Sequence, residues 1–430
     1  MSRPVYAFRP YNVGRWILWS LFALVLLAAP WAFKSNLSHS MLSQMGIAII
    51  ACLAYNLLLG QGGMLSFGHA VYTGLGGYLA MHALNAVSAG AVSIPVSLIP
   101  LVGGAGGLFF ACLLGYVTTR KSGTTFAMIT LGMAELVSAM SLMFSEFFGG
   151  EAGVSGNRVA GAPFMGINFG PQIQVYYLIA LYTFVCVALL FAFTRTPLGR
   201  MLNAVRDNPE RVEFIGYNTQ HVRYFAFMIA GFFSGIAGGL GVLNFEIVTA
   251  EVVGAARSGA YLLFTFLGGA TFFFGPIIGA ILMILASVLL SELTKAWLLY
   301  LGLVFLFMVM YAPGGVASLI MMNLRVASFG HLRRLWVAYV GLGVLALLAL
   351  LGAGAWIEMV YHLQLNSALG PTLKFAGITL DALSVRSWFG AGFVLVTALG
   401  LFELARRQYR RDWDAIQVQI EQEIKRREAL

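Results

Sequence analysis

Long apolar segments separated by short polar ones recur along almost the whole chain. Many of these segments contain about 20 residues, the length that an α-helix needs to cross a bilayer. A lipid-facing β-barrel would instead alternate apolar and polar residues along each strand. The pattern predicts twelve transmembrane helices, near residues 16–33, 41–59, 70–88, 94–118, 124–143, 174–194, 224–245, 252–268, 276–291, 297–312, 335–357 and 388–405.

The composition agrees with a polytopic membrane protein. Of the 430 residues, 60% are hydrophobic and 10% are charged, and the mean hydropathy is +0.84, far from the values of soluble domains. Cys52, Cys112 and Cys186 fall in three different predicted spans, where a free thiol usually packs as a small hydrophobic group. We therefore expect neither a disulfide nor a metal site.

The distribution of Lys and Arg predicts the orientation of the chain, because cytoplasmic segments collect these residues. With twelve spans both termini lie on one side, and the segments on that side hold 20 of the 26 Lys and Arg residues. We expect both termini in the cytoplasm, so the net charge of +9 reflects orientation and not binding to nucleic acid. The other side receives Lys34, Arg158, Arg257, Lys295, Lys374 and Arg386.

A glycine-rich stretch, GQGGMLSFGHA, interrupts the apolar pattern at residues 60–70. It lacks the lysine and the spacing of a nucleotide-binding loop. One interpretation is close helix packing, which small residues permit. The other is a broken or re-entrant element, because irregular backbone at membrane depth must be buried in protein or line a cavity. Gly63, Ser66, Gly68 and His69 would then line or buttress a path across the membrane, with a packing role as the alternative for His69.

A second interruption, GGATFFFGP at residues 268–276, echoes the first. The match is short and its spacing differs by one residue, so an internal repeat is only suggested. Paired breaks indicate a transport path, which adds Gly268 and Gly269 to the candidates.

Glu135 also lies within a predicted span, where a carboxylate is costly and usually functional. A neutral, hydrogen-bonded structural role is the alternative.

A charged loop of 29 residues, RTPLGRMLNAVRDNPERVEFIGYNTQHVR, follows the sixth predicted span at 195–223. Asn208 suits a helix N-cap, Pro209 and Glu210 suit the first turn, and Gly216 suits the left-handed residue after the helix. The loop therefore predicts a two-turn helix at 209–215. So short a helix gains its stability from packing, which leaves two interpretations: a solvated connector or a surface for a partner.

Four stretches, NLLLGQGGMLSFGHAVYTGLGGYLA, FAMITLGMAELV, RTPLGRMLNAVRDNPERVEFIGYN and LGGATFFFGPIIGA, resemble the M-type permease subunit of branched-chain amino-acid ABC importers over residues 40–320. In that family the arginine-rich loop docks on the ATPase. The family commonly has two alanines where this chain has Arg211 and Val212. The resemblance assigns ATPase coupling to Gly199, Arg200, Arg206, Asp207, Asn208, Glu213 and Gly216, and we include Glu210 of the same short helix among the coupling residues.

The resemblance implies a permease subunit of an ATP-driven importer in the bacterial inner membrane, acting on branched-chain or other hydrophobic amino acids or a related small solute. It also implies a paralogous permease, two cytoplasmic ATPases, a periplasmic solute-binding protein and membrane lipid as partners, with ATP bound only by the partner ATPases. The alternatives are an ion-coupled secondary transporter, whose expected intramembrane charges are nearly absent, and a scaffold that transports nothing. The chain has no nucleophile–base arrangement or Walker loop, so we do not expect an enzyme.

We expect an all-α fold with a ten-span core and two additional C-terminal spans. In the tail, Trp413, Ile416, Ile420 and Ile424 recur at helical spacing and predict an amphipathic helix. It would either lie solvated at the membrane interface or contact a partner subunit. The expected regions are an N-terminal cytoplasmic tail (1–15), a transmembrane permease domain with the coupling loop 195–223 (16–320), a two-span extension (321–405) and a cytoplasmic amphipathic tail (406–430).

Overall fold

The computed structural model describes residues 13–159, 168–312, 314–330, 332–365, 370–375 and 377–429. Residues 1–12 of the expected N-terminal tail lie outside this part. The helices are α1 (Val13–Ala32), α2 (Asn36–Asn56), α3 (Ala70–Ser88), α4 (Ile99–Thr118), α5 (Gly123–Met143), α6 (Ser145–Phe148), α7 (Gln172–Arg195), α8 (Pro197–Asp207), α9 (Pro209–Phe214), α10 (Thr219–Phe245), α11 (Ala255–Gly268), α12 (Gly275–Leu293), α13 (Trp297–Tyr311), α14 (Gly315–Ser328), α15 (Leu332–Leu365) and α16 (Val385–Ala429).

Short elements connect these helices. A π-helical turn, η1 (Leu57–Gln61), continues α2, and 3-10 turns occupy η2 (Val96–Leu98), η3 (Gly150–Ala152) and η4 (Ala250–Val253). Two small antiparallel sheets pair β1 (Val154–Ser155) with β2 (Ile247–Val248) and β3 (Thr372–Phe375) with β4 (Ile378–Asp381). The chain forms two compact units, one of Met1–Glu292 with Leu301–Ala317 and one of Leu293–Tyr300 with Ser318–Leu430.

The expected all-α polytopic membrane fold is confirmed. Among the described residues eight helices are long and apolar enough to cross a membrane, or nine if the bent pair α13 and α14 forms one span. Each expected span coincides with a helix, but α11 has only 14 residues and the apolar part of α1 is short, Trp16–Ala32. Helix α3 is long enough to span but is less hydrophobic, because it carries polar side chains such as His82 and Asn85. Most of its residues are buried in protein, where the hydropathy of a lipid-facing helix is not required.

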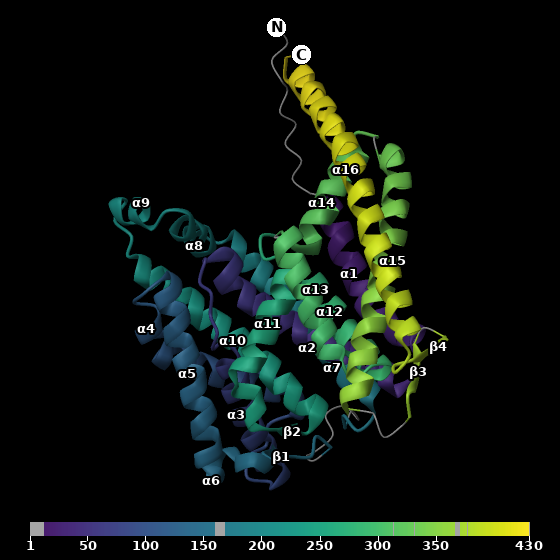
Figure 1. The fold of residues 1–430 in the computed structure, drawn as a ribbon. Helices are drawn as coiled ribbons and strands as arrows, with labels where there is room; N and C mark the ends of the chain where they lie inside the picture. Colours follow the sequence, from purple (N-terminus) through teal and green to yellow (C-terminus); the bar gives the residue numbers. More distant parts are fainter. Residues whose placement is uncertain are drawn as a thin grey trace. The chain divides into compact units, whose positions relative to one another are not determined.

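The first unit is built around α10, which packs against α2, α3 and α4 (Figure 1). Glycines allow the backbones of these helices to approach closely. A Cβ added to Gly103 on α4 would lie 2.6 Å from the carbonyl oxygen of Gly235 on α10, and one added to Gly235 would lie 3.0 Å from the Cα of Gly104. Helices α8 and α9 lie at one end of this unit, while α6, β1 and β2 lie at the other end (Figure 1).

In the second unit, α15 packs along α16, and the expected last span and tail form one continuous helix, α16. Ile416 and Ile420 of the predicted amphipathic stripe are buried against Val326 of α14 and Leu335 of α15. The hydroxyls of Tyr339 and Tyr409 lie 3.0 Å apart beside this cluster. The apolar stripe of the tail is therefore covered by other helices of its own unit.

We predict that Gly235→Ala destabilises the first unit by about 1–3 kcal/mol, the usual cost of adding atoms to a packed core, because the new methyl group would overlap the α4 backbone. Gly241→Ala on the same helix is the matched control, since a Cβ at Gly241 meets nothing within 4 Å. Thermal unfolding of the two purified variants in detergent tests this; equal unfolding temperatures would contradict the assigned packing of α10 on α4.

Candidate functional site

The stretch between α2 and α3 is a break in the helical structure that is enclosed by protein. The π-helical turn η1 ends at Gln61, and α3 begins only at Ala70. Ser66 and His69 have no exposed surface. π-Helical turns interrupt the regular hydrogen-bond ladder and occur frequently at functional sites. This segment is the irregular, protein-buried backbone that a membrane protein tolerates only away from lipid.

Hydrogen bonds from three surrounding helices hold this break in place. The Tyr55 hydroxyl of α2 donates to the Ser66 carbonyl oxygen at 3.0 Å. The Phe67 amide donates to Thr130 Oγ1 of α5 at 3.1 Å. The Ala70 amide donates to the hydroxyl oxygen of Ser258 on α11 at 2.9 Å. Side chains thus replace the helical partners that the interrupted backbone has lost.

His69 is packed and hydrogen-bonded inside the first unit. Its Nε2 lies 2.6 Å from Ser234 Oγ of α10, and its ring meets the Tyr55 ring edge-on with centroids 5.4 Å apart. Among the described residues, the hydroxyl oxygen of Ser66 and the Nδ1 of His69 are buried without a hydrogen-bond partner. His69 therefore joins α10 to the break. The two unpaired atoms beside this contact could still form hydrogen bonds.

The glycines of the first break permit close approach and unusual backbone geometry. Gly63 has a φ of +64°, a conformation that favours glycine. A Cβ at Gly63 would lie 2.8 Å from the Cγ of Arg206 on α8, and a Cβ at Gly68 would overlap the carbonyl oxygen of Thr130 on α5. These two positions lie where neighbouring helices press on the break.

The two interrupted stretches touch each other. A Cβ at Gly60 would overlap the carbonyl oxygen of Ala270 in the second break. Gly269 has a φ of +109°, and a Cβ at Gly268 would lie 2.7 Å from the amide nitrogen of Gly279 in α12. The structure therefore brings Gly63, Ser66, Gly68, His69, Gly268 and Gly269 into one region.

Glu135 lies apart from this region. It is exposed on α5, in the same helix as Met128, which is 66% exposed, and Leu136, which is 58% exposed. A carboxylate on the outer surface of a spanning helix requires a water-filled cavity or another protein chain beside it. The position of Glu135 thus marks an outer surface of the unit, not its interior.

The charged loop contains two helices, of which sequence analysis identified only the second. Thr196 caps α8 by accepting the Gly199 amide at 3.2 Å, and Pro197 occupies its first turn. Leu202 and Val205 are buried with exposed fractions of 0% and 2%, so one face of α8 packs onto the spanning helices. The Thr-Pro pair and the spacing of these apolar residues were a signal that could have identified α8.

The Asn208 cap and the left-handed Gly216 predicted for the second helix are confirmed. Asn208 Oδ1 accepts the Arg211 amide at 2.9 Å, α9 ends at Phe214, one residue earlier than expected, and Gly216 has a φ of +88°. Glu213 Oε1 accepts the Thr219 hydroxyl at 2.8 Å and so ties α9 to the start of α10. The remaining predicted residues of the loop are Arg200 and Glu210, which are exposed, and Arg206 and Asp207, which form an ion pair at 2.9 Å.

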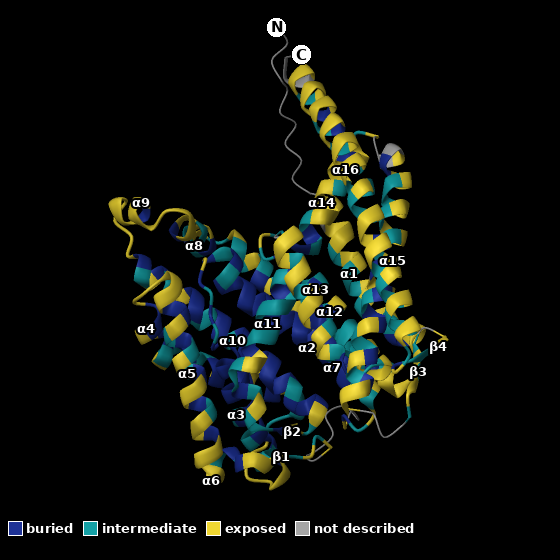
Figure 2. Cartoon of the chain, in the orientation of Figure 1, coloured by how far each residue is buried: buried dark blue, intermediate teal, exposed yellow. Residues whose placement is uncertain are grey.

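An apolar surface at the C-terminal end of α9 was not predicted from the sequence. Phe214, Ile215 and Tyr217 are 90%, 65% and 53% exposed, at the end of the first unit where α8 and α9 lie (Figure 2). Contiguous exposed apolar side chains outside membrane spans mark protein-interaction sites. The signal in the sequence was the apolar FIGY segment within an otherwise charged loop. We call these three residues the α9 tip.

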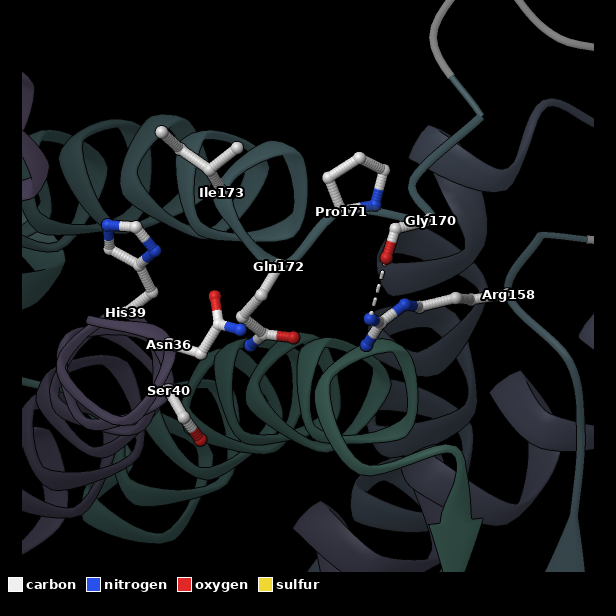
Figure 3. A pocket seen from close by; sticks show the side chains of 8 residues that line it. All are labelled: Asn36, His39, Ser40, Arg158, Gly170, Pro171, Gln172 and Ile173. Atoms are coloured by element: carbon white, nitrogen blue, oxygen red, sulfur yellow. Dashed lines mark hydrogen bonds between the residues drawn. The ribbon is translucent and has the colours of Figure 1, made fainter. Parts of the chain in front are cut away.

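A pocket of about 610 Å³ opens at the N-terminal end of α2 (Figure 3). Arg158 lines one side of it, and its guanidinium donates to the carbonyl oxygens of Phe169, Gly170 and Leu243 at 2.9–3.1 Å. These bonds use the charge of Arg158 to hold the end of α10 and the start of α7 together. The pocket is lined by Asn36, His39, Ser40, Arg158, Gly170, Pro171, Gln172 and Ile173.

Comparison with known proteins identifies the family. The model of the branched-chain amino acid transport system permease component matches residues 38–313. The chain belongs to this permease family. It is a permease subunit of an ABC importer, a multi-pass inner-membrane protein and a transport component rather than an enzyme.

Two curated relatives match about two thirds of the chain. The high-affinity branched-chain amino acid transport system permease protein LivM of Salmonella typhimurium is 28% identical over 318 residues, covering 69% of this chain and 74% of the relative. LivM of Escherichia coli is 27% identical over 319 residues, with the same coverage. The fructose import permease protein FrcC of Rhizobium meliloti is 26% identical over 170 residues, covering 34% of this chain and 46% of that relative. No solved structure matches the chain.

We predict that Gly68→Leu lowers uptake by the assembled transporter at least tenfold while insertion into the membrane is preserved. The side chain would overlap the Thr130 carbonyl and displace the first break from α5. Gly259→Leu on α11 serves as the control, because a Cβ there meets nothing within 4 Å. Normal uptake by Gly68→Leu at normal expression would remove this stretch from the transport mechanism.

Proposed function

We propose that the permease imports branched-chain or other hydrophobic amino acids, using ATP that is bound and hydrolysed by separate ATPase subunits. The relatives that match most of its length are named for branched-chain amino acid transport. The shorter match to a fructose import permease indicates that related chains move other solutes. The permease itself would bind no cofactor, and a related small solute such as another amino acid remains the alternative substrate.

The arrangement of the loop between α7 and α10 is the observation that supports ATP as the energy source. Helix α8 buries Leu202 and Val205 against the spanning helices, while the α9 tip presents Phe214 with 90% of its surface exposed. One part of the loop is thus anchored in the permease, and the other offers apolar surface to a partner. We assign the α9 tip to contact with an ATPase subunit, on the cytoplasmic side predicted by the Lys and Arg distribution.

The proposed complex contains a second, paralogous permease, two ATPases and a periplasmic solute-binding protein. The exposed α5 surface around Glu135 suits the second permease, because protein or enclosed water must cover a carboxylate at this depth. The end of the first unit that carries β1, β2 and the Arg158 pocket would face the binding protein. Transport would proceed by alternating access, with closure of the ATPases moving α8 and α9 and reorienting the spans.

Reconstitution of the complex tests the energy source. We expect the permease, assembled with subunits encoded by neighbouring genes, to support leucine uptake into proteoliposomes when ATP is supplied to the ATPases. A non-hydrolysable ATP analogue should abolish this uptake. Uptake that is driven by an ion gradient in the absence of any ATPase would instead establish a secondary transporter.

We predict that Phe214→Asp weakens ATPase binding at least tenfold, because a buried aromatic contact at an interface is often worth about 2 kcal/mol or more. Phe214→Leu is the matched control, since it preserves an apolar side chain and should retain most of the binding. Quantitative co-purification of the ATPase with each variant measures the effect. Equal ATPase recovery with Asp and Leu at this position would show that the α9 tip is not the docking surface.

A further inference from the structure

Arg206 connects the coupling loop directly to the first break in the spanning helices. We propose that Arg206 is the positioning residue through which movement of α8 reaches both interrupted stretches. This inference rests on the proposed ATP-driven function and adds to it a specific route of transmission. The route runs from Arg206 to the Gly60 carbonyl, and from Gly60 to the second break at Ala270.

The hydrogen bond of Arg206 replaces one that the broken helix cannot form. In a regular α-helix the Met64 amide would donate to the Gly60 carbonyl oxygen, but here it donates to Leu58 at 2.9 Å. The Nη1 of Arg206 donates to the Gly60 carbonyl oxygen instead. A cationic side chain is well suited to the carbonyl groups at a helix end, since these carry partial negative charge.

The packing of α8 on the same segment adds a steric connection. A Cβ at Gly63 would lie 2.8 Å from the Cγ of Arg206, and a Cβ at Gly62 would lie 3.2 Å from Cδ1 of Leu202. The side chains of α8 therefore lie directly on the backbone of residues 62–63. A displacement of α8 would move this backbone through contact, as well as through the hydrogen bond.

The guanidinium of Arg206 is held in this orientation by its neighbour. Its Nε and Nη2 each lie 2.9 Å from Oδ1 of Asp207. The Arg206 side chain is 37% exposed, whereas Phe214 at the α9 tip is 90% exposed. Arg206 is thus directed to the permease rather than to a partner, which distinguishes its role from docking.

From Gly60 the connection continues into the core of the first unit. Gly60 packs against the Ala270 carbonyl, so the same residue contacts Arg206 and the second break. Farther along the first break, His69 is joined to Ser234 of α10. A movement imposed at Gly60 would therefore act on both breaks and on the central helix.

The experiment compares Arg206→Met with Arg206→Lys in the complete, reconstituted transporter. Methionine preserves much of the aliphatic packing but cannot donate to Gly60, whereas lysine keeps a donor. We expect Arg206→Met to retain ATPase binding within twofold and to continue ATP hydrolysis, while the number of solute molecules imported per ATP falls at least tenfold. Arg206→Lys should restore most of that ratio, and Lys121→Met, which removes an exposed charge elsewhere, should leave it unchanged.

Three outcomes would overturn the inference. The first is a normal transport ratio in Arg206→Met, and the second is loss of ATPase binding in parallel with uptake, which would make Arg206 a docking residue. If Arg206→Met is not recovered folded, Gly63→Val takes its place, because the added side chain would displace that of Arg206. We expect Gly63→Val to show the same uncoupling. A normal transport ratio in Gly63→Val is the third outcome that would overturn the inference. Absence of ATP-dependent uptake by the unmodified complex would contradict the proposed function instead, so the two failures are distinguishable.

Discussion

The need to satisfy buried backbone groups governs the centre of this permease. Where α2 ends and α3 has yet to begin, the chain has lost its regular helical hydrogen bonds, and neither lipid nor bulk water replaces them. Thr130, Ser258 and Arg206 supply the missing partners from three other helices. The break can exist only because the surrounding helices are in place, so its geometry depends on theirs.

This dependence supports the coupling role that we propose for the loop between α7 and α10. The two short helices of this loop differ in what they contact. Helix α8 buries apolar residues against the spans, and α9 presents an exposed apolar tip. The exposed Phe214 and the position of Arg206 against a helix end favour a partner surface over a solvated connector. The loop thus joins an external surface to the irregular backbone of the first break, where small movements change hydrogen bonds rather than whole helices.

Close packing of glycines extends the same principle through the core. The backbone contacts of Gly103 with Gly235, and of Gly60 with Ala270, leave no space for a methyl group. Such contacts transmit displacement directly, since packed interiors have little room to absorb it. The glycines that suggested either packing or a broken element in the sequence serve both purposes.

The sequence by itself determined the helical membrane fold, the two breaks, and the cap and end of α9, because these follow from hydrophobic periodicity, glycine and local capping chemistry. Length and hydropathy alone do not decide which of these helices span the membrane, because α3 is largely buried in protein and α11 has only 14 residues. Only the tertiary structure decided that Gly60 meets Ala270 and Arg206, that His69 meets Ser234, and that Glu135 is exposed. These contacts join residues far apart in the chain, and local patterns carry no information about which distant side chain will complete a broken helix.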